Sequence, residues 1–143
     1  LRREVFNKRT PFCEDLRNSE DFELWWRIGL AGVRIAYLSE ILMTRFKPAS
    51  SLSSTSLLAA NNSLKALDLC VNEALQNGRA ELMPFLDIKY RNVWQNLIRI
   101  YGKLGNCEAV WKAFFKSIKY GFRPGSLKLL ITAIMRLNKN LKV

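Results

Sequence analysis

The chain has 143 residues, the length of one domain and enough to bury a sizeable core. It is 49% hydrophobic and 24% charged, with 7 Gly and 4 Pro, which excludes a disordered, collagen-like or disulfide-dense protein. It carries 23 Lys and Arg against 12 Asp and Glu, a net charge of +11, and has no histidine. Histidine-based nucleophilic catalysis and histidine-ligated zinc are therefore excluded, so any chemistry must use carboxylates, hydroxyls, thiols, lysine or arginine.

The three cysteines, Cys13, Cys70 and Cys107, are widely spaced and form no C-x-x-C pair. This spacing indicates structural thiols in a reducing compartment. The chain starts at Leu1, and no apolar run approaches the roughly 20 residues that a membrane span requires. We therefore expect a piece of a longer cytoplasmic protein, which could lie at the inner face of the plasma membrane.

The first predicted element is a helix that begins after a cap at Asn18 or Ser19 and ends at Gly32. Its first turn is acidic, and its apolar residues recur at helical spacing. The stretches 33–38 and 41–46 are short and rich in β-forming residues. They predict two strands, or one strand and an extended connection.

A serine-rich stretch at 48–56 separates this region from a second one that is helical throughout. Its helical periodicity and stop signals predict a bundle of about four helices: about 55–76, about 80–103 with Pro84 in its first turn, a third from a cap at Asn106 to Gly121, and a fourth from Ser126 to about Asn138. The predicted fold is therefore mainly α, with one short β element.

The positive charge is concentrated near the end of the chain. Residues 99–143 contain ten Lys and Arg and one acid, Glu108, so +9 of the +11 lies there. One interpretation is a peripheral membrane surface, since each base near anionic lipid contributes about 1 kcal/mol. The other is a helical bundle with a solvated basic face. We expect no binding to nucleic acid, because the sequence has no recognised DNA- or RNA-binding module.

The densest cluster of polar and aromatic residues lies in the first helix. Glu20 and Asp21 place two adjacent carboxylates at its N-terminus, and Arg27 follows about two turns later. A carboxylate in that position is held ionised by the helix dipole and free N–H groups, so it can accept a proton. Spacing alone favours a simpler interpretation, a capped amphipathic helix whose tryptophans, Trp25 and Trp26, belong to the core.

The residues themselves carry a resemblance. Residues 20–27 (EDFELWWR) resemble the acceptor-side motif E-D-x-x-L-W-x-R of family 2 glycosyltransferases, inverting enzymes of the GT-A fold. Upstream, 3–6 and 11–16 resemble that family's R-x-x-F…G-F-D-E-x-L approach. Downstream, 32–42 resembles its G-x-I-x-Y-L-x-E-x-L strand, and 45–53 its Y-R-x-H-P-x-S-x-S segment. The helical remainder is similar only loosely, as the variable C-terminal extension of many members.

The resemblance implies that Asp21 is the general base. It would deprotonate a hydroxyl of a glycan or lipid-linked acceptor as that oxygen attacks a nucleotide-sugar, and a positioned carboxylate contributes roughly 10²–10⁴-fold to the rate. Glu20 would orient the loop or contact the acceptor. Trp25 and Arg27 would support the acceptor side, with an aromatic face available to pack on a sugar ring.

The resemblance also implies that Arg45 and Lys47 could contact phosphate oxygens. The family often has a histidine where Lys47 stands, and lysine cannot ligate a metal in the same way. Cys13 replaces the aspartate of F-D-E, a change expected to affect only a turn. The chain has no Asp-x-Asp triplet and no β-α-β nucleotide-binding run. The divalent cation, Mg or Mn, and the nucleotide-sugar would therefore bind outside this chain.

We accordingly divide the chain into two parts, the acceptor-side end of a GT-A domain at 1–53 and a helical extension at 54–143. It is expected to be the C-terminal part of an inverting hexosyltransferase and not to transfer sugar by itself. The alternative is a non-catalytic, basic helical module that docks on a membrane or on a protein partner. Sedimentation with anionic vesicles tests that alternative.

Overall fold

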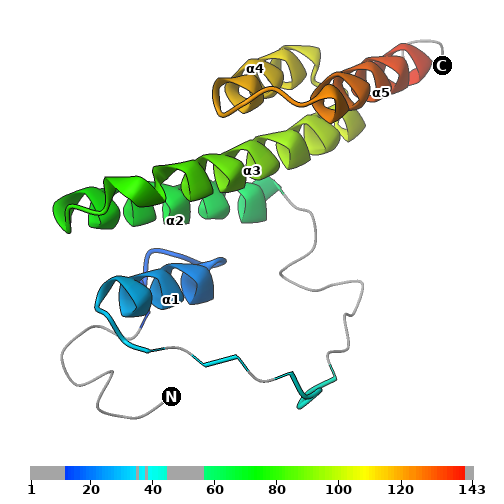
Figure 1. Cartoon of the computed structure of the whole chain (residues 1–143). Coiled ribbons are helices and arrows are strands. Elements are labelled where there is room, and N and C mark those ends of the chain that lie inside the picture. Colours follow the sequence, from blue (N-terminus) through cyan, green and yellow to red (C-terminus); the bar gives the residue numbers. More distant parts are fainter. Residues whose placement is uncertain (1–11, 35, 38, 45–56, 141–143) are drawn as a thin grey trace.

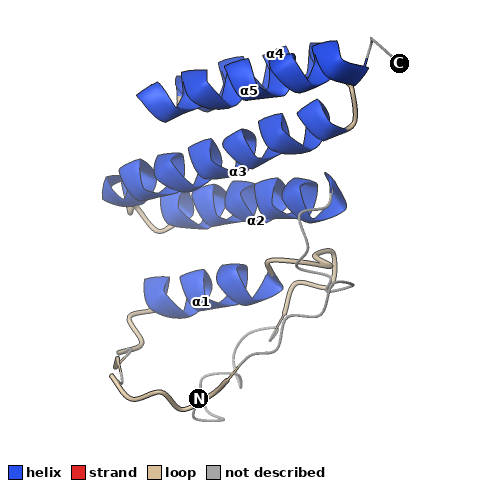
Figure 2. Ribbon diagram, turned by 90° about the vertical axis from the view of Figure 1, so that its right-hand side faces the viewer, coloured by secondary structure: helices blue, strands red, loops and turns tan. Residues whose placement is uncertain are grey.

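The computed structural model describes residues 12–34, 36–37, 39–44 and 57–140. Within these ranges it contains five α-helices and one 3-10 turn: α1 Glu20–Leu30, α2 Leu57–Gln76, η2 Ala80–Leu82, α3 Met83–Lys103, α4 Cys107–Lys119 and α5 Pro124–Asn140. In Figures 1 and 2, α1 lies on one side of the α2–α3 pair, and α4 and α5 lie on the other side of α3. The prediction of a mainly α fold is confirmed.

The helix boundaries follow local signals in the sequence. The chain reverses after α2 at Gly78 and after α3 at Gly105, whose φ angles of 67° and 76° lie in the left-handed region that glycine tolerates. The side chain of Asn106 accepts a hydrogen bond from the Ala109 amide at 2.9 Å, so the predicted cap of α4 is confirmed. Helix α5 begins at Pro124, two residues before the predicted start, because proline suits the first helical position.

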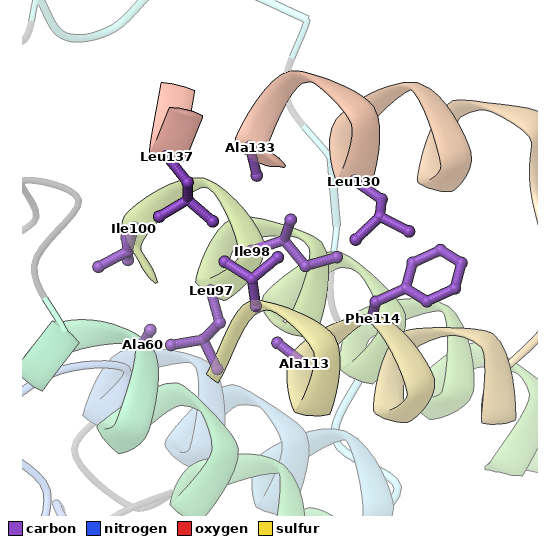
Figure 3. Packing of buried hydrophobic residues seen from close by; sticks show 10 residues of the cluster. Ala60, Leu97, Ile98, Ile100, Ala113, Phe114, Leu130, Ala133 and Leu137 are labelled. Atoms are coloured by element: carbon purple, nitrogen blue, oxygen red, sulfur yellow. The ribbon is translucent and has the colours of Figure 1, made fainter. Parts of the chain in front are cut away.

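The larger hydrophobic core lies where α3, α4 and α5 meet. Leu97 and Ile98 of α3 are almost completely buried, and residues of α4 and α5 pack around them (Figure 3). The buried members of this cluster are Ala60, Leu97, Ile98, Ile100, Val110, Ala113, Phe114, Leu130, Ala133 and Leu137. This core fixes the basic half of the chain on the C-terminal half of α3.

A tight crossing joins α3 to α5. A Cβ atom added to Gly102 would lie 2.8 Å from the Cβ and 3.1 Å from the Cα of Ala133. Real side chains do not approach so closely, so the absence of a side chain at Gly102 allows the two helices to come together.

The smaller core cluster joins α2 to the N-terminal half of α3. Its buried members are Leu67 and Cys70 of α2 with Leu86 and Tyr90 of α3. Phe22 and Trp26 of α1 pack against this cluster. Helix α1 is therefore fixed on the helical extension, although the predicted boundary at 53/54 lies outside the described residues.

The predicted β element is not formed in the part of 33–46 that the structure describes, namely 33–34, 36–37 and 39–44, and residues 45–46 lie outside it. A strand needs a neighbouring strand to satisfy its backbone N–H and C=O groups, and the described chain offers none. Several apolar side chains of this stretch are consequently exposed, among them Tyr37 at 90% and Ile41 at 93%. Among the described helices, none has an apolar stretch long enough to cross a bilayer.

Candidate functional site

The predicted general base lies in the first turn of α1. Asp21 is exposed, and its Oδ1 accepts a hydrogen bond from the Phe22 amide at 2.7 Å. This amide is one of the N–H groups that a helix start leaves without an intrahelical partner. The bond therefore satisfies this amide and fixes the orientation of the carboxylate at the helix start. Glu20, the first residue of α1, is half-buried beside it.

The predicted side-chain cap by Asn18 or Ser19 is wrong. Ser19 stands at the cap position but makes no side-chain capping bond, because its φ of 66° turns its hydroxyl elsewhere. Its Oγ lies 2.9 Å from Oγ of Ser63 in α2 and donates to Oδ1 of Asn18 at 3.0 Å. A left-handed conformation costs a non-glycine residue about 1–2 kcal/mol. Here it directs the start of α1 onto α2.

A buried ion pair holds the inner face of α1. The Nε of Arg27 donates to Oε1 of Glu23 at 2.5 Å, and Nη2 donates to Oε2 at 3.0 Å. Both side chains are buried. The bidentate hydrogen bond raises the pKa of Arg27, because it stabilises the charged guanidinium. Arg27 therefore acts inside the fold, and Glu23, which the sequence did not single out, is its partner.

The two tryptophans of α1 differ in burial. Trp25 is 45% exposed and lies one helical turn after Asp21, on the same outer face. Trp26 is half-buried, and its Nε1 donates to the carbonyl of Cys70 at 3.0 Å, so its prediction as a core residue is confirmed. Burial raises the pKa of the Cys70 thiol to about 12, which keeps it protonated. Cys70 is therefore a structural thiol, as predicted.

A groove of about 430 Å³ opens beside the start of α1, between α1, α2 and α3, and is called here the polar groove after its amide and hydroxyl side chains. Asparagines, serines and one lysine line it together with apolar side chains: Asn18, Ser19, Phe22, Ala59, Ala60, Ser63, Leu67, Lys89, Asn92, Val93 and Asn96. Phe22, whose amide binds Asp21, is part of this lining. The groove has the size of a small-ligand site and a mixed amide, hydroxyl and aromatic lining.

An aromatic cluster fixes Phe22 in this lining. The Nζ of Lys89 lies 5.5 Å from the centre of the Phe22 ring and 5.3 Å from that of Phe85. The Trp26 ring stacks on Phe85 with centroids 6.0 Å apart. The positive ammonium group is attracted to the face of each of these two rings, so it links α3 to α1 at the edge of the groove.

The polar groove was missed by the sequence analysis, although a local signal existed. Lys89, Asn92 and Asn96 recur at intervals of three and four residues, which places polar side chains along one face of α3. The other walls come from α1 and α2 and depend on tertiary packing. The predicted phosphate contacts, Arg45 and Lys47, lie outside the described residues.

The described residues contain no group of three or more His, Cys, Asp or Glu side chains that could hold a metal ion. Comparisons with protein-family models, curated proteins and solved structures found no match to this chain. The resemblance to glycosyltransferases accordingly rests on the motif residues in 1–53 alone.

Proposed function

We propose that this chain supplies the acceptor-binding side of an inverting glycosyltransferase, with Asp21 as the general base. The observation that carries the proposal is the exposed Asp21 carboxylate in the first turn of α1, within the resembling motif and bonded to the amide of Phe22, which lines the polar groove. An exposed carboxylate can reach a substrate hydroxyl, whereas a buried, paired one such as Glu23 cannot.

The reaction requires one proton transfer at this carboxylate. Asp21 takes the proton of the acceptor hydroxyl while its oxygen forms a bond to the anomeric carbon of the nucleotide-sugar. The bond between that carbon and the phosphate oxygen breaks, and the nucleoside diphosphate leaves with the bonding electrons. Attack from the face opposite the leaving group inverts the configuration.

The lining of the polar groove supports a carbohydrate acceptor. Side-chain amides of Asn92 and Asn96 offer both donors and acceptors, which match the hydroxyls of a sugar. Phe22 adds an aromatic surface for the apolar face of a ring. Trp25 offers a second aromatic surface one turn from Asp21.

Rigid support of α1 also favours the proposal, because a general base must be held within hydrogen-bond reach of its proton. The buried Glu23–Arg27 pair stiffens the inner face of the helix. In this role Arg27 supports the acceptor side without touching the acceptor. Glu20 remains proposed as an orienting group at the helix start.

Exposed apolar residues at 41–43 support attachment to a further sheet. Ile41, Leu42 and Met43 are 69–93% exposed, and the β-branched Ile41 favours a strand. A nucleotide-binding half with a β-sheet would pair with this backbone and cover these side chains. We propose that such a half provides the sites for the nucleotide-sugar and the divalent cation.

The test is Asp21→Asn in the enzyme that joins this chain to its nucleotide-binding half. We expect turnover, measured as release of nucleoside diphosphate across a panel of nucleotide-sugars, to fall by about 10²–10⁴-fold. The dissociation constant of the nucleotide-sugar should change less than about twofold, because its site lies elsewhere.

Asp87→Asn is the matched control, since Asp87 is an exposed carboxylate that belongs to α3 and does not line the polar groove. It should leave turnover unchanged. Retention of turnover in Asp21→Asn would exclude Asp21 as the base.

A further inference from the structure

Helix α4 exposes aromatic and basic side chains next to each other. Val110, Ala113 and Phe114 face the core, whereas Trp111 and Phe115 are 40% and 59% exposed. Their rings stack on each other with centroids 6.0 Å apart. Two large aromatic side chains that form one exposed patch indicate a contact surface more strongly than isolated apolar residues do.

A second groove, called here the α4 groove, adjoins this patch. It measures about 680 Å³ and lies between α3 and α4, lined by Trp94, Tyr101, Ala109, Lys112, Ala113, Phe115, Lys116 and Lys119. Its interior is aromatic and aliphatic, and its only charged lining residues are three lysines. The indole N–H of Trp94 is buried without a hydrogen-bond acceptor among the described residues.

The charge around the α4 groove is one-sided. The single acid of α4, Glu108, pairs with Lys112 at 2.5 Å, and both side chains are well exposed. Lys116 and Lys119 are exposed in the last turn, and no ion pair is present at either among the described residues. An occupant should therefore combine an apolar part with negative charge.

We infer that the α4 groove and the Trp111–Phe115 patch dock on the surface of an anionic phospholipid bilayer. The acyl region packs against Trp94, Tyr101 and Phe115, while the lipid phosphates contact Lys116 and Lys119. Aromatic rings at the headgroup level and lysines beside them are the features of peripheral membrane helices. This inference goes beyond glycosyl transfer and does not depend on it.

A bilayer fits these observations better than a purely polar acidic protein surface or a nucleic acid. Negative charge alone would satisfy the lysines but leave the apolar interior of the groove and Phe115 in water. A phospholipid meets both requirements in one molecule, because its phosphate and its acyl chains lie at adjacent depths.

The test is sedimentation of the whole chain with vesicles. We expect binding to vesicles of phosphatidylglycerol and phosphatidylcholine that is roughly 30-fold stronger than binding to phosphatidylcholine alone, from about 1 kcal/mol for each of Lys116 and Lys119. Binding should weaken as the salt concentration is raised from roughly 0.05 to roughly 0.5 M, because salt screens the attraction between the lysines and the lipid phosphates. Equal sedimentation with both vesicle types, or none with either, would overturn the inference.

Variants locate the surface. Trp111→Ser with Phe115→Ser, and separately Lys116→Gln with Lys119→Gln, should each reduce binding at least about tenfold. Because all four side chains are exposed, the variants should keep the helical circular dichroism of the parent.

Matched controls lie outside the α4 groove. Ile131→Ser removes an apolar side chain of similar exposure, 51%, from α5. Arg123→Gln with Lys128→Gln removes two charges beside a different hollow at the start of α5. Both should retain binding, and an equal loss in these controls would show that net charge or general apolarity, not the α4 groove, drives it.

Discussion

The crossing of α3 and α5 predicts opposite effects for two chemically identical substitutions. Gly102→Ala adds a methyl group 2.8 Å from the Cβ of Ala133, whereas Gly29→Ala in α1 adds one with no atom within 4 Å. Neither glycine requires a positive φ. The two variants therefore share the change in helix propensity and differ in the packing they encounter.

The expected magnitudes follow from these surroundings. Replacing a helical glycine with alanine stabilises by about 0.5–1 kcal/mol, and Gly29→Ala should show this gain. At Gly102 the gain is opposed by about 1–3 kcal/mol, because an extra methyl in a packed contact forces the helices apart. We therefore expect the free energy of unfolding of Gly102→Ala to lie about 1–3 kcal/mol below that of Gly29→Ala.

Urea denaturation followed by circular dichroism at about 222 nm measures this difference, which corresponds to roughly 1 M in the midpoint. Adding Ala133→Gly to Gly102→Ala removes the closest contact, so the double variant should show a favourable coupling energy in a double-mutant cycle. Equal stability of Gly102→Ala and Gly29→Ala would refute the close approach of α3 to α5.

Three further predictions concern single side chains. The pKa of the Cys70 thiol is raised from 9.0 to about 12. As the pH rises, the unfolded chain therefore loses the thiol proton at a lower pH than the folded chain does. The free energy of unfolding should fall between about pH 9 and about pH 12, by up to about 1.4 kcal/mol per pH unit. Stepped-pH urea titrations should show a shallower fall in Cys70→Ala, and equal slopes would contradict the assignment. Asn106→Ala should lower the free energy of unfolding by about 1 kcal/mol through loss of the α4 cap, with Asn106→Asp close to the parent. Glu23→Gln should cost about 2 kcal/mol because it weakens the buried bidentate pair with Arg27, and unchanged thermal unfolding would contradict that role.

The helical half of the fold could be predicted because its signals are local. Apolar periodicity predicted the helical segments of α2 to α5. Gly78 and Gly105 indicated where the chain turns after α2 and after α3. Whether the predicted strands form could not be decided from local signals in the same way. β-forming residue types at 33–46 give the tendency, but a strand forms only when a second strand is available to pair with it.

The same difference between local signals and tertiary contacts applies to the candidate site. Asp21 and Trp25 lie on the exposed face of α1, in keeping with the helical spacing. The predicted cap did not form at Ser19, because its left-handed backbone turns the hydroxyl toward Asn18 and Ser63. Burial of the Glu23–Arg27 pair was not predictable, since charges four residues apart on a helix are usually solvated.

Helix α3 forms a wall of both grooves. Asn92 and Asn96 face the polar groove beside α1, whereas Trp94 and Tyr101 line the α4 groove on another face of the same helix. The backbone amides of one helix exchange their hydrogens through shared opening events, and a ligand slows exchange by stabilising the closed state. A sugar in one groove and a lipid in the other would therefore protect the same α3 amides without touching each other.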